Sequence, residues 1–180
     1  MITSDDLKPL RSASDDYAET ERLKSKFRDL KLRRKPFHLT GEDFEEVLTW
    51  KLRTQYGRQR RLREGNTDSL IQGITRLALN IEHEDSDYEL ELRIGVLCAL
   101  RGVAVPVASA VLALTSPDDY AVIDFRAWRQ IFPDKPLILN VTGYKKYLNA
   151  IRPLARELNW PVQEVDLAIW EYDRRRDGRT

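Results

Sequence analysis

The fold is decided by residues 100–112, which read LRGVAVPVASAVL, and by residues 121–126, which read AVIDFR. Gly102 interrupts one helical pattern, and Pro106 suits the first turn of the next helix, where its missing N–H would have no helical partner. Nearly every residue from 105 to 114 is apolar, which is typical of a central helix buried on all sides. Asp124 then precedes another helical pattern. The stretch predicts two helices joined by a glycine turn, followed by an aspartate that opens a third helix.

Composition sets the class of protein. The chain has 180 residues, of which 42% are hydrophobic, and its 30 basic and 29 acidic residues leave a net charge of +1. This length and composition predict a globular domain, while the charge balance alone does not favour nucleic acid. The single cysteine, Cys98, excludes an internal disulfide and a four-cysteine metal or iron–sulfur site. No signal peptide and no apolar run of about 20 residues is apparent, so we expect a soluble, cytoplasmic protein without a membrane partner.

The order of elements predicts an all-α fold. Residues 1–36 are strongly charged and end at Pro36, and we interpret them as a helical extension of a domain formed by 37–180. The only strand signal is a short one at 137–141. Helix starts are predicted from capping residues at Thr40, Ser86 and Thr142, and a further helix is predicted to open at the run Asn66-Thr67-Asp68.

The glycine turn has two interpretations. N–H groups at the start of the second helix lack helical partners, and together with the helix dipole they can bind a phosphate. Such contacts would position DNA without reading its sequence. The alternative is an ordinary helical hairpin with a glycine cap.

Residues 86–132 resemble the helix-hairpin-helix DNA glycosylase superfamily, whose hairpin reads roughly L-P-G-V-G-x-K-T-A. The matching positions are Leu100, Gly102, Val103 and Ala108. Asp124 follows Pro106 by 18 residues, the spacing expected between the family's hairpin lysine and its aspartate. The resemblance implies double-stranded DNA as the partner and a monovalent cation at the hairpin carbonyls. It also implies backbone binding by Arg101, Gly102, Val103, Ala104, Val105 and Val107.

Three departures from the family pattern refine this expectation. Arg101 replaces the hairpin proline, and Ala104 replaces its second glycine, which would cost about 1 kcal/mol if Ala104 were left-handed. Pro106 occupies the lysine position and carries no amine, so no Schiff base can form there. The resemblance therefore implies a monofunctional DNA N-glycosylase of base excision repair that hydrolyses the glycosidic bond of a flipped base. It implies no cofactor, no iron–sulfur cluster and no side-chain metal site.

Asp124 also has two interpretations, which are compatible. Aspartate is a good N-cap for the helix that follows. In the family, the aspartate instead helps water to displace the base and stabilises the cationic sugar. Two functional alternatives remain open beside the enzyme: a non-catalytic DNA-binding module and a helical protein-interaction module on the same fold.

Other candidate site residues precede the glycine turn in the sequence. Trp50 could stack on an extruded base, and Lys51 could contact DNA or act as an alternative amine; the alternative is a core tryptophan beside a solvated lysine. A basic run could neutralise phosphates, or it could form a solvated face. Its candidate DNA contacts are Arg53, Arg58, Arg60 and Arg61.

Overall fold

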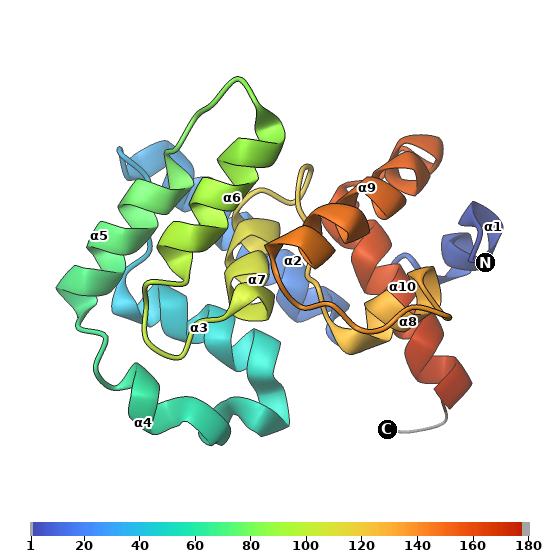
Figure 1. The fold of residues 1–180 in the computed structure, drawn as a ribbon, viewed down its shortest axis with the longest axis horizontal. Coiled ribbons are helices and arrows are strands. Elements are labelled where there is room, and N and C mark those ends of the chain that lie inside the picture. Colours follow the sequence, from blue (N-terminus) through green and yellow to red (C-terminus); the bar gives the residue numbers. More distant parts are fainter. Residues whose placement is uncertain (1, 178–180) are drawn as a thin grey trace.

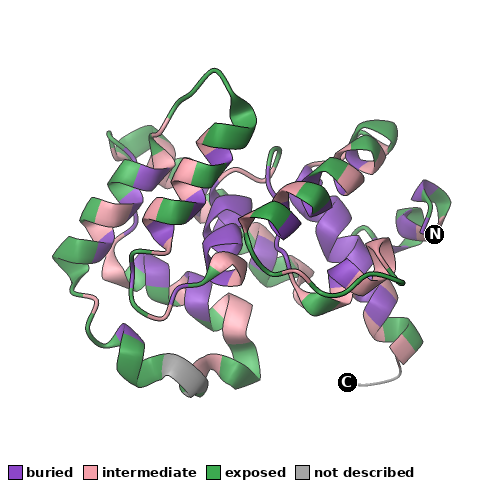
Figure 2. Ribbon diagram, viewed as in Figure 1, coloured by how far each residue is buried: buried purple, intermediate pink, exposed green. Residues whose placement is uncertain are grey.

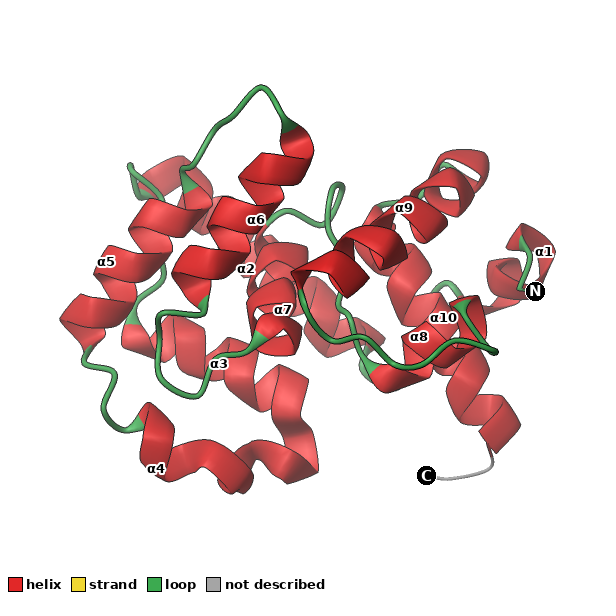
Figure 3. Ribbon diagram, viewed as in Figure 1, coloured by secondary structure: helices red, strands yellow, loops and turns green. Residues whose placement is uncertain are grey.

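The computed structural model describes residues 2–177, apart from the side chains of residues 58 and 59, and all regular structure in this part is helical (Figure 3). The all-α prediction is confirmed. The elements, shown in Figure 1, are α1 (Ser4–Leu7), η1 (Lys8–Leu10), α2 (Tyr17–Arg33), α3 (Gly41–Leu52), η2 (Arg53–Gln59), α4 (Arg60–Arg63), α5 (Asp68–Leu79), α6 (Ser86–Leu97), α7 (Val105–Thr115), α8 (Phe125–Ile131), α9 (Val141–Leu158) and α10 (Val162–Asp177).

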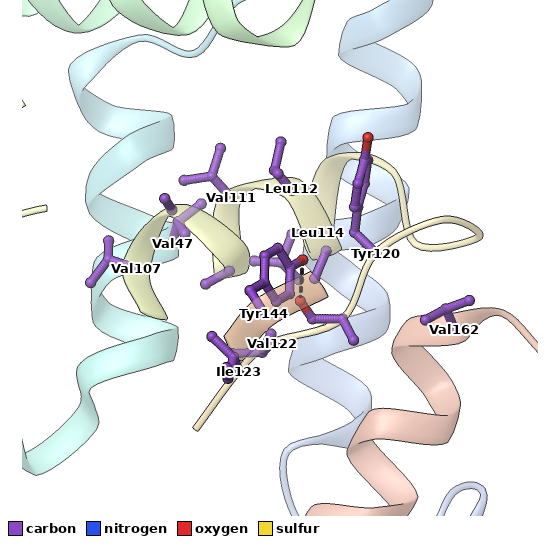
Figure 4. Close-up of a cluster of buried hydrophobic side chains, with 14 of the residues drawn as sticks. Val47, Val107, Val111, Leu112, Leu114, Tyr120, Val122, Ile123, Tyr144 and Val162 are labelled. Carbon is purple, nitrogen blue, oxygen red and sulfur yellow. Dashed lines mark hydrogen bonds between the residues drawn. The ribbon is translucent and has the colours of Figure 1, made fainter. Parts of the chain in front are cut away.

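Helix α7 forms the centre of the core. Its residues 107–115 are all buried, as the apolar run predicted, and α2, α3 and α6 pack against it. In Figure 2 the buried residues gather on α7 and on the facing parts of its neighbours. Figure 4 shows Val107, Val111 and Leu112 on α7, with Val47 of α3 beside them. The small side chains of α7 allow this close approach from several directions.

The N-terminal segment shares this core. Leu7, Leu23 and Phe27 are completely buried and belong to the same hydrophobic cluster as α7. Helix α2 ends at Arg33, shortly before Pro36. The charged residues of 1–36 therefore surround an apolar face that packs on the rest of the chain.

Local capping explains where the helices begin, with two corrections to the sequence interpretation. Thr40 caps α3 as predicted. Asp85, rather than Ser86, caps α6, and Asn140, rather than Thr142, caps α9. Asp and Asn accept backbone N–H groups at least as well as Ser and Thr, so the nearest suitable acceptor starts the helix.

The strand signal at 137–141 is wrong. Residues 136–140 form an irregular connection, and α9 already begins at Val141 because the Asn140 side chain accepts the N–H of Gly143 at 2.9 Å. A strand needs a neighbouring extended segment to satisfy its backbone groups, and none is paired with this one in the described part of the chain.

No helix between residues 2 and 177 has the combined length and apolar character that crossing a bilayer requires. Across the same residues, His, Cys, Asp and Glu side chains form no group of three that could hold a metal ion.

Candidate functional site

A cleft of about 520 Å³ lies between two groups of elements that are distant in sequence. The end of α3 and the start of η2 supply the lining residues of one wall, and α8, the connection before α9, and α10 supply those of the other. Figure 1 shows where α3, α8, α9 and α10 lie in the fold. The volume is in the range of small-molecule sites. The lining side chains include Trp50, Lys51, Arg53, Gln55, Pro106, Val122, Asp124, Phe125, Arg126, Leu137, Leu139, Gln163, Asp166, Leu167 and Trp170.

The irregular segment 120–123 carries the chain through the core to this cleft. Its backbone polar groups are buried and require partners. The hydroxyl of Tyr144 on α9 donates to the carbonyl of Ala121 at 2.7 Å, the dashed bond of Figure 4. The N–H of Val122 donates to Oδ2 of Asp166 on α10 at 3.0 Å. Side chains from two helices therefore fix the segment that leads to Asp124.

Ser109 of α7 provides the third attachment. Its Oγ accepts the N–H of Ile123 at 3.1 Å and donates to the carbonyl of Pro106 at 2.9 Å. This hydroxyl, which is completely buried, joins the first turn of α7 to the residue before Asp124. The first turn of α7 and the candidate carboxylate are thus held in one rigid unit.

Asp124 carries out the capping role predicted for it. Its Oδ1 accepts the N–H of Ala127 at 2.9 Å and starts α8. Its Oδ2 lies 3.6 Å from Nζ of Lys51, and 21% of the Asp124 side chain remains exposed. One oxygen is therefore structural, while the other lies beside an amine in the cleft.

Trp50 and Lys51 reach the cleft from α3, on the opposite wall. The indole Nε1 of Trp50 donates to Oγ1 of Thr20 at 3.0 Å, so its ring is fixed against α2 while it lines the cleft. Only 13% of the Lys51 side chain is exposed. The alternative of a solvated Lys51 is therefore wrong, because its amine is directed to Asp124.

Two arginines flank Trp170 on α10. The Arg53 guanidinium lies 4.7 Å from the ring centroid and also pairs with Asp16. The Arg126 guanidinium lies 5.6 Å from the same ring and binds Asp173 at 3.0 Å. Both arginines line the cleft, and each cation is partly compensated by a carboxylate.

The remainder of the basic run does not share this surface. Arg60 is exposed and pairs with Glu64 at 3.3 Å, and Arg61 is also exposed. Arg63 is buried, with its guanidinium 4.8 Å from the Tyr56 ring. The Arg58 side chain lies outside the described residues. Among the described side chains of the run, Arg53 alone lines the cleft.

The turn at 98–104 contains the left-handed glycine that the sequence predicted, but it does not contain the left-handed alanine considered for Ala104. Gly102 has a φ of 72°, the left-handed conformation that glycine adopts without strain. Ala104 has a φ of −112° and is extended, so the expected strain at this alanine is absent. A single glycine therefore suffices for the turn.

The backbone groups of this turn are largely occupied within the protein. The side chain of Asn66 hydrogen-bonds to both backbone polar groups of Arg101. Its Oδ1 accepts the Arg101 N–H and its Nδ2 donates to the Arg101 carbonyl, both at 2.9 Å. The N–H groups of Val107 and Ala108 both donate to the Ala104 carbonyl, and the intervening Pro106 has no N–H. Few N–H groups are left in the first turn of α7 for a phosphate.

The neighbouring carbonyls are partly occupied too. The Leu100 carbonyl accepts the N–H of Val103 at 3.2 Å, and the Arg101 carbonyl accepts from Asn66. A monovalent cation at these carbonyls stays a prediction.

Sequence reasoning missed two polar residues of α10, Gln163 and Asp166. Burial, together with the negative charge of nearby Asp124, raises the pKa of Asp166 to about 7. Gln163 is 1% exposed, and its Oε1 has no hydrogen-bond partner among the described residues. The available signal was the spacing 163, 166, 167 and 170, which places two polar residues on a helix face shared with Leu167 and Trp170.

Comparison of the chain with protein-family models, curated protein sequences and solved structures returned no match.

Proposed function

We propose that this protein binds double-stranded DNA and hydrolyses the N-glycosidic bond of a flipped, damaged or modified base, with Asp124 as the catalytic carboxylate. The observation that carries the proposal is the position of Asp124: it is fixed by capping α8, and its second oxygen lies in an aromatic-walled cleft. A base must leave the duplex for its glycosidic bond to be reached, and a cleft of this size can receive one.

The chemistry requires only a placed carboxylate and water. As the bond between C1′ and the base nitrogen breaks, its electron pair leaves with the base and positive charge develops on the sugar. A preorganised carboxylate stabilises this charge without reorganisation. The same carboxylate can accept a proton from the water that attacks C1′; the departing base nitrogen takes up a proton, and Asp124 is ionised again when it loses its own.

The cleft surroundings suit a nucleic acid. Three cationic side chains line the cleft, Lys51, Arg53 and Arg126, against two carboxylates, Asp124 and Asp166. Cations beside the cleft can neutralise phosphates. Large apolar side chains are also exposed among the lining residues: Phe125, Leu137 and Leu139. Such side chains can pack against unstacked bases.

A non-catalytic DNA-binding module on this fold is the second candidate. It is favoured by the fact that both oxygens of Asp124 lie near partners within the protein, the Ala127 N–H and the Lys51 amine. In that case Asp124 serves only to hold α8 and α3 together.

Base release separates the two candidates. Duplexes that carry a panel of lesions are incubated with wild type, with Asp124→Asn and with the control Asp118→Asn, which changes an exposed carboxylate. Asparagine also caps helices well, so the first variant should fold. The enzyme predicts release by wild type and by Asp118→Asn, reduced about 100-fold or more in Asp124→Asn. Equal release by all three proteins contradicts the role of Asp124. Duplex binding without release of any base supports the second candidate.

A further inference from the structure

Arg53 is the most exposed of the three cationic side chains that line the cleft. It comes directly after α3, on one wall of the cleft, and its guanidinium lies 4.7 Å from the centroid of the Trp170 ring on the other wall. Of its side chain 40% is exposed, against 13% for Lys51 and 16% for Arg126. Arg53 therefore presents its charge to a ligand that enters the cleft.

The backbone at Arg53 is strained. Its φ of 46° and ψ of −121° form a combination that glycine adopts readily and that crowds the Cβ atom of any other residue. Among residues 2–177, Asn159 is the other non-glycine residue with a positive φ, and asparagine tolerates such values better than arginine does. Residues held in such conformations cost free energy and concentrate at functional sites. Glycine would remove the strain, so the conformation itself does not explain why an arginine stands here.

The guanidinium of Arg53 retains hydrogen-bond donors for a ligand. Its Nη2 pairs with a carboxylate oxygen of Asp16, and no further hydrogen bond from this guanidinium is found among the described residues. A guanidinium carries five N–H donors in a planar fork, so one carboxylate leaves several of them available. By contrast, Arg126 binds Asp173 at 3.0 Å and lies 3.9 Å from Asp177. Arg53 is therefore the lining cation best placed to bind an additional anion.

The surroundings of this guanidinium suit a phosphate group. Three cations and two carboxylates line the cleft, so the lining side chains are positive in sum even when both carboxylates are ionised. Trp170 orients the guanidinium through a cation–π contact, which lowers the entropy that binding would otherwise cost. Asp16 offsets part of the charge, but a guanidinium can pair with a carboxylate and a phosphate at once through different N–H groups.

We infer that Arg53 binds a phosphodiester group of the DNA strand beside the extruded nucleotide, with its guanidinium oriented by Trp170 and Asp16. This inference rests on the proposed function for its ligand, because the phosphate accompanies the nucleotide that leaves the duplex. Such a contact carries no sequence information, but it fixes the strand so that the extruded nucleotide reaches Asp124. Arg53 is thus a binding residue and takes no part in the chemistry.

Replacement of single phosphates locates the contact. A duplex is prepared with a tetrahydrofuran abasic analogue at its centre, which has no base to release, and each phosphate near the analogue is replaced in turn by an uncharged methylphosphonate. The affinity of wild type and of Arg53→Gln for every duplex is measured by fluorescence anisotropy. We expect one methylphosphonate to weaken binding by wild type about tenfold or more, the range for a hydrogen bond between charged groups. In Arg53→Gln the same replacement should have little effect.

Two further variants separate the side chain from the backbone. Arg53→Gly removes the guanidinium but retains the turn, because glycine adopts this φ without strain, and it should respond like Arg53→Gln. The control Arg76→Gln changes an exposed arginine of α5 that does not line the cleft, and it should keep the wild-type response. Each protein is compared with itself on two duplexes, so a change in its folded fraction cancels. The slope of log affinity against log salt concentration should also fall in magnitude by about 0.9 in Arg53→Gln.

Three outcomes would overturn the inference: no duplex binding by wild type, no single phosphate whose replacement weakens binding, or the same response to that replacement in wild type, Arg53→Gln and Arg53→Gly. The first outcome would also overturn the proposed function. Because the abasic duplex tests binding alone, base release from lesion duplexes without an Arg53-dependent phosphate overturns only this inference. An Arg53-dependent phosphate without base release from any duplex overturns the glycosylase proposal and leaves the phosphate contact standing.

Discussion

The buried carboxyl group of Asp166 makes a quantitative prediction about stability and pH. Burial and the charge of Asp124 raise its pKa from the ordinary 3.8 to about 7. The folded protein therefore retains a proton on Asp166 that the unfolded chain releases between about pH 4 and pH 7. Over this window the unfolded state binds fewer protons, so stability falls as pH rises. At about 1.36 kcal/mol per pH unit, the loss over roughly three units is about 4 kcal/mol.

Asp166→Asn should remove this loss. Asparagine resembles the protonated acid: its oxygen can accept the Val122 N–H, and its amide can donate to the Tyr147 oxygen. We expect the variant and wild type to have similar free energies of unfolding at about pH 4. The difference should grow in favour of the variant to about 4 kcal/mol at pH 8.

Urea denaturation at several pH values measures the difference directly. Titrating groups remote from Asp166 affect wild type and variant alike. At Asp43, for instance, burial acts to raise the pKa, but hydrogen bonds from Lys26, Arg34 and Thr40 hold it low, so its contribution is present above its ordinary pKa and is lost in acid. Asp118→Asn, at an exposed position, controls for the loss of one charge. A difference between Asp166→Asn and wild type that stays constant with pH would show that folding does not raise the pKa of Asp166.

Three further perturbations test how the site is held, each by urea denaturation. Gly143→Ala would place a Cβ atom 2.0 Å from the carbonyl oxygen of Ile138, so we expect the free energy of unfolding to fall by about 3 kcal/mol. In the control Gly73→Ala the added Cβ meets nothing within 4 Å, so the free energy of unfolding should rise by about 0.5 kcal/mol or more. Equal effects of the two substitutions would contradict the close packing at Gly143. Ser109→Ala leaves the Ile123 N–H without its acceptor and should lower the free energy of unfolding by about 1–3 kcal/mol. An unchanged free energy of unfolding would mean that this hydrogen bond does not stabilise the fold. Gly102→Ala should lower the free energy of unfolding by about 1 kcal/mol, because alanine is strained at the left-handed φ of this position. An unchanged free energy of unfolding would show that the backbone of the turn adjusts to the alanine.

Local patterns in the sequence predicted the features that depend on neighbouring residues. The apolar run of α7 specified its burial, Gly102 specified the turn, and Asp124 specified the start of α8. Each of these can be predicted from a few neighbouring residues in the sequence, although the burial of α7 itself comes from α2, α3 and α6. The strand signal at 137–141 failed because strand formation depends on a partner that the local sequence cannot reveal.

The parts of the site that escaped prediction depend on tertiary packing. Asp166 meets the segment before Asp124 only because α10 packs beside it. The amide oxygen of Gln163, which has no hydrogen-bond partner among the described residues, can be recognised only once its surroundings are known. Similarly, Arg63 belongs by sequence to a basic run but is buried against Tyr56. The pairing of Lys51 with Asp124 across the cleft required the structure for the same reason.

The most direct test of the account is the single-turnover rate of base release from the duplex that wild type processes best, compared between wild type and Asp124→Asn. The two proteins are matched for folded fraction by thermal unfolding and for duplex affinity by titration. If Asp124 is the catalytic carboxylate, the variant binds and folds like wild type but releases the base about 100-fold or more slowly. Equal rates would contradict the claim that the carboxylate of Asp124 performs the chemistry of this cleft.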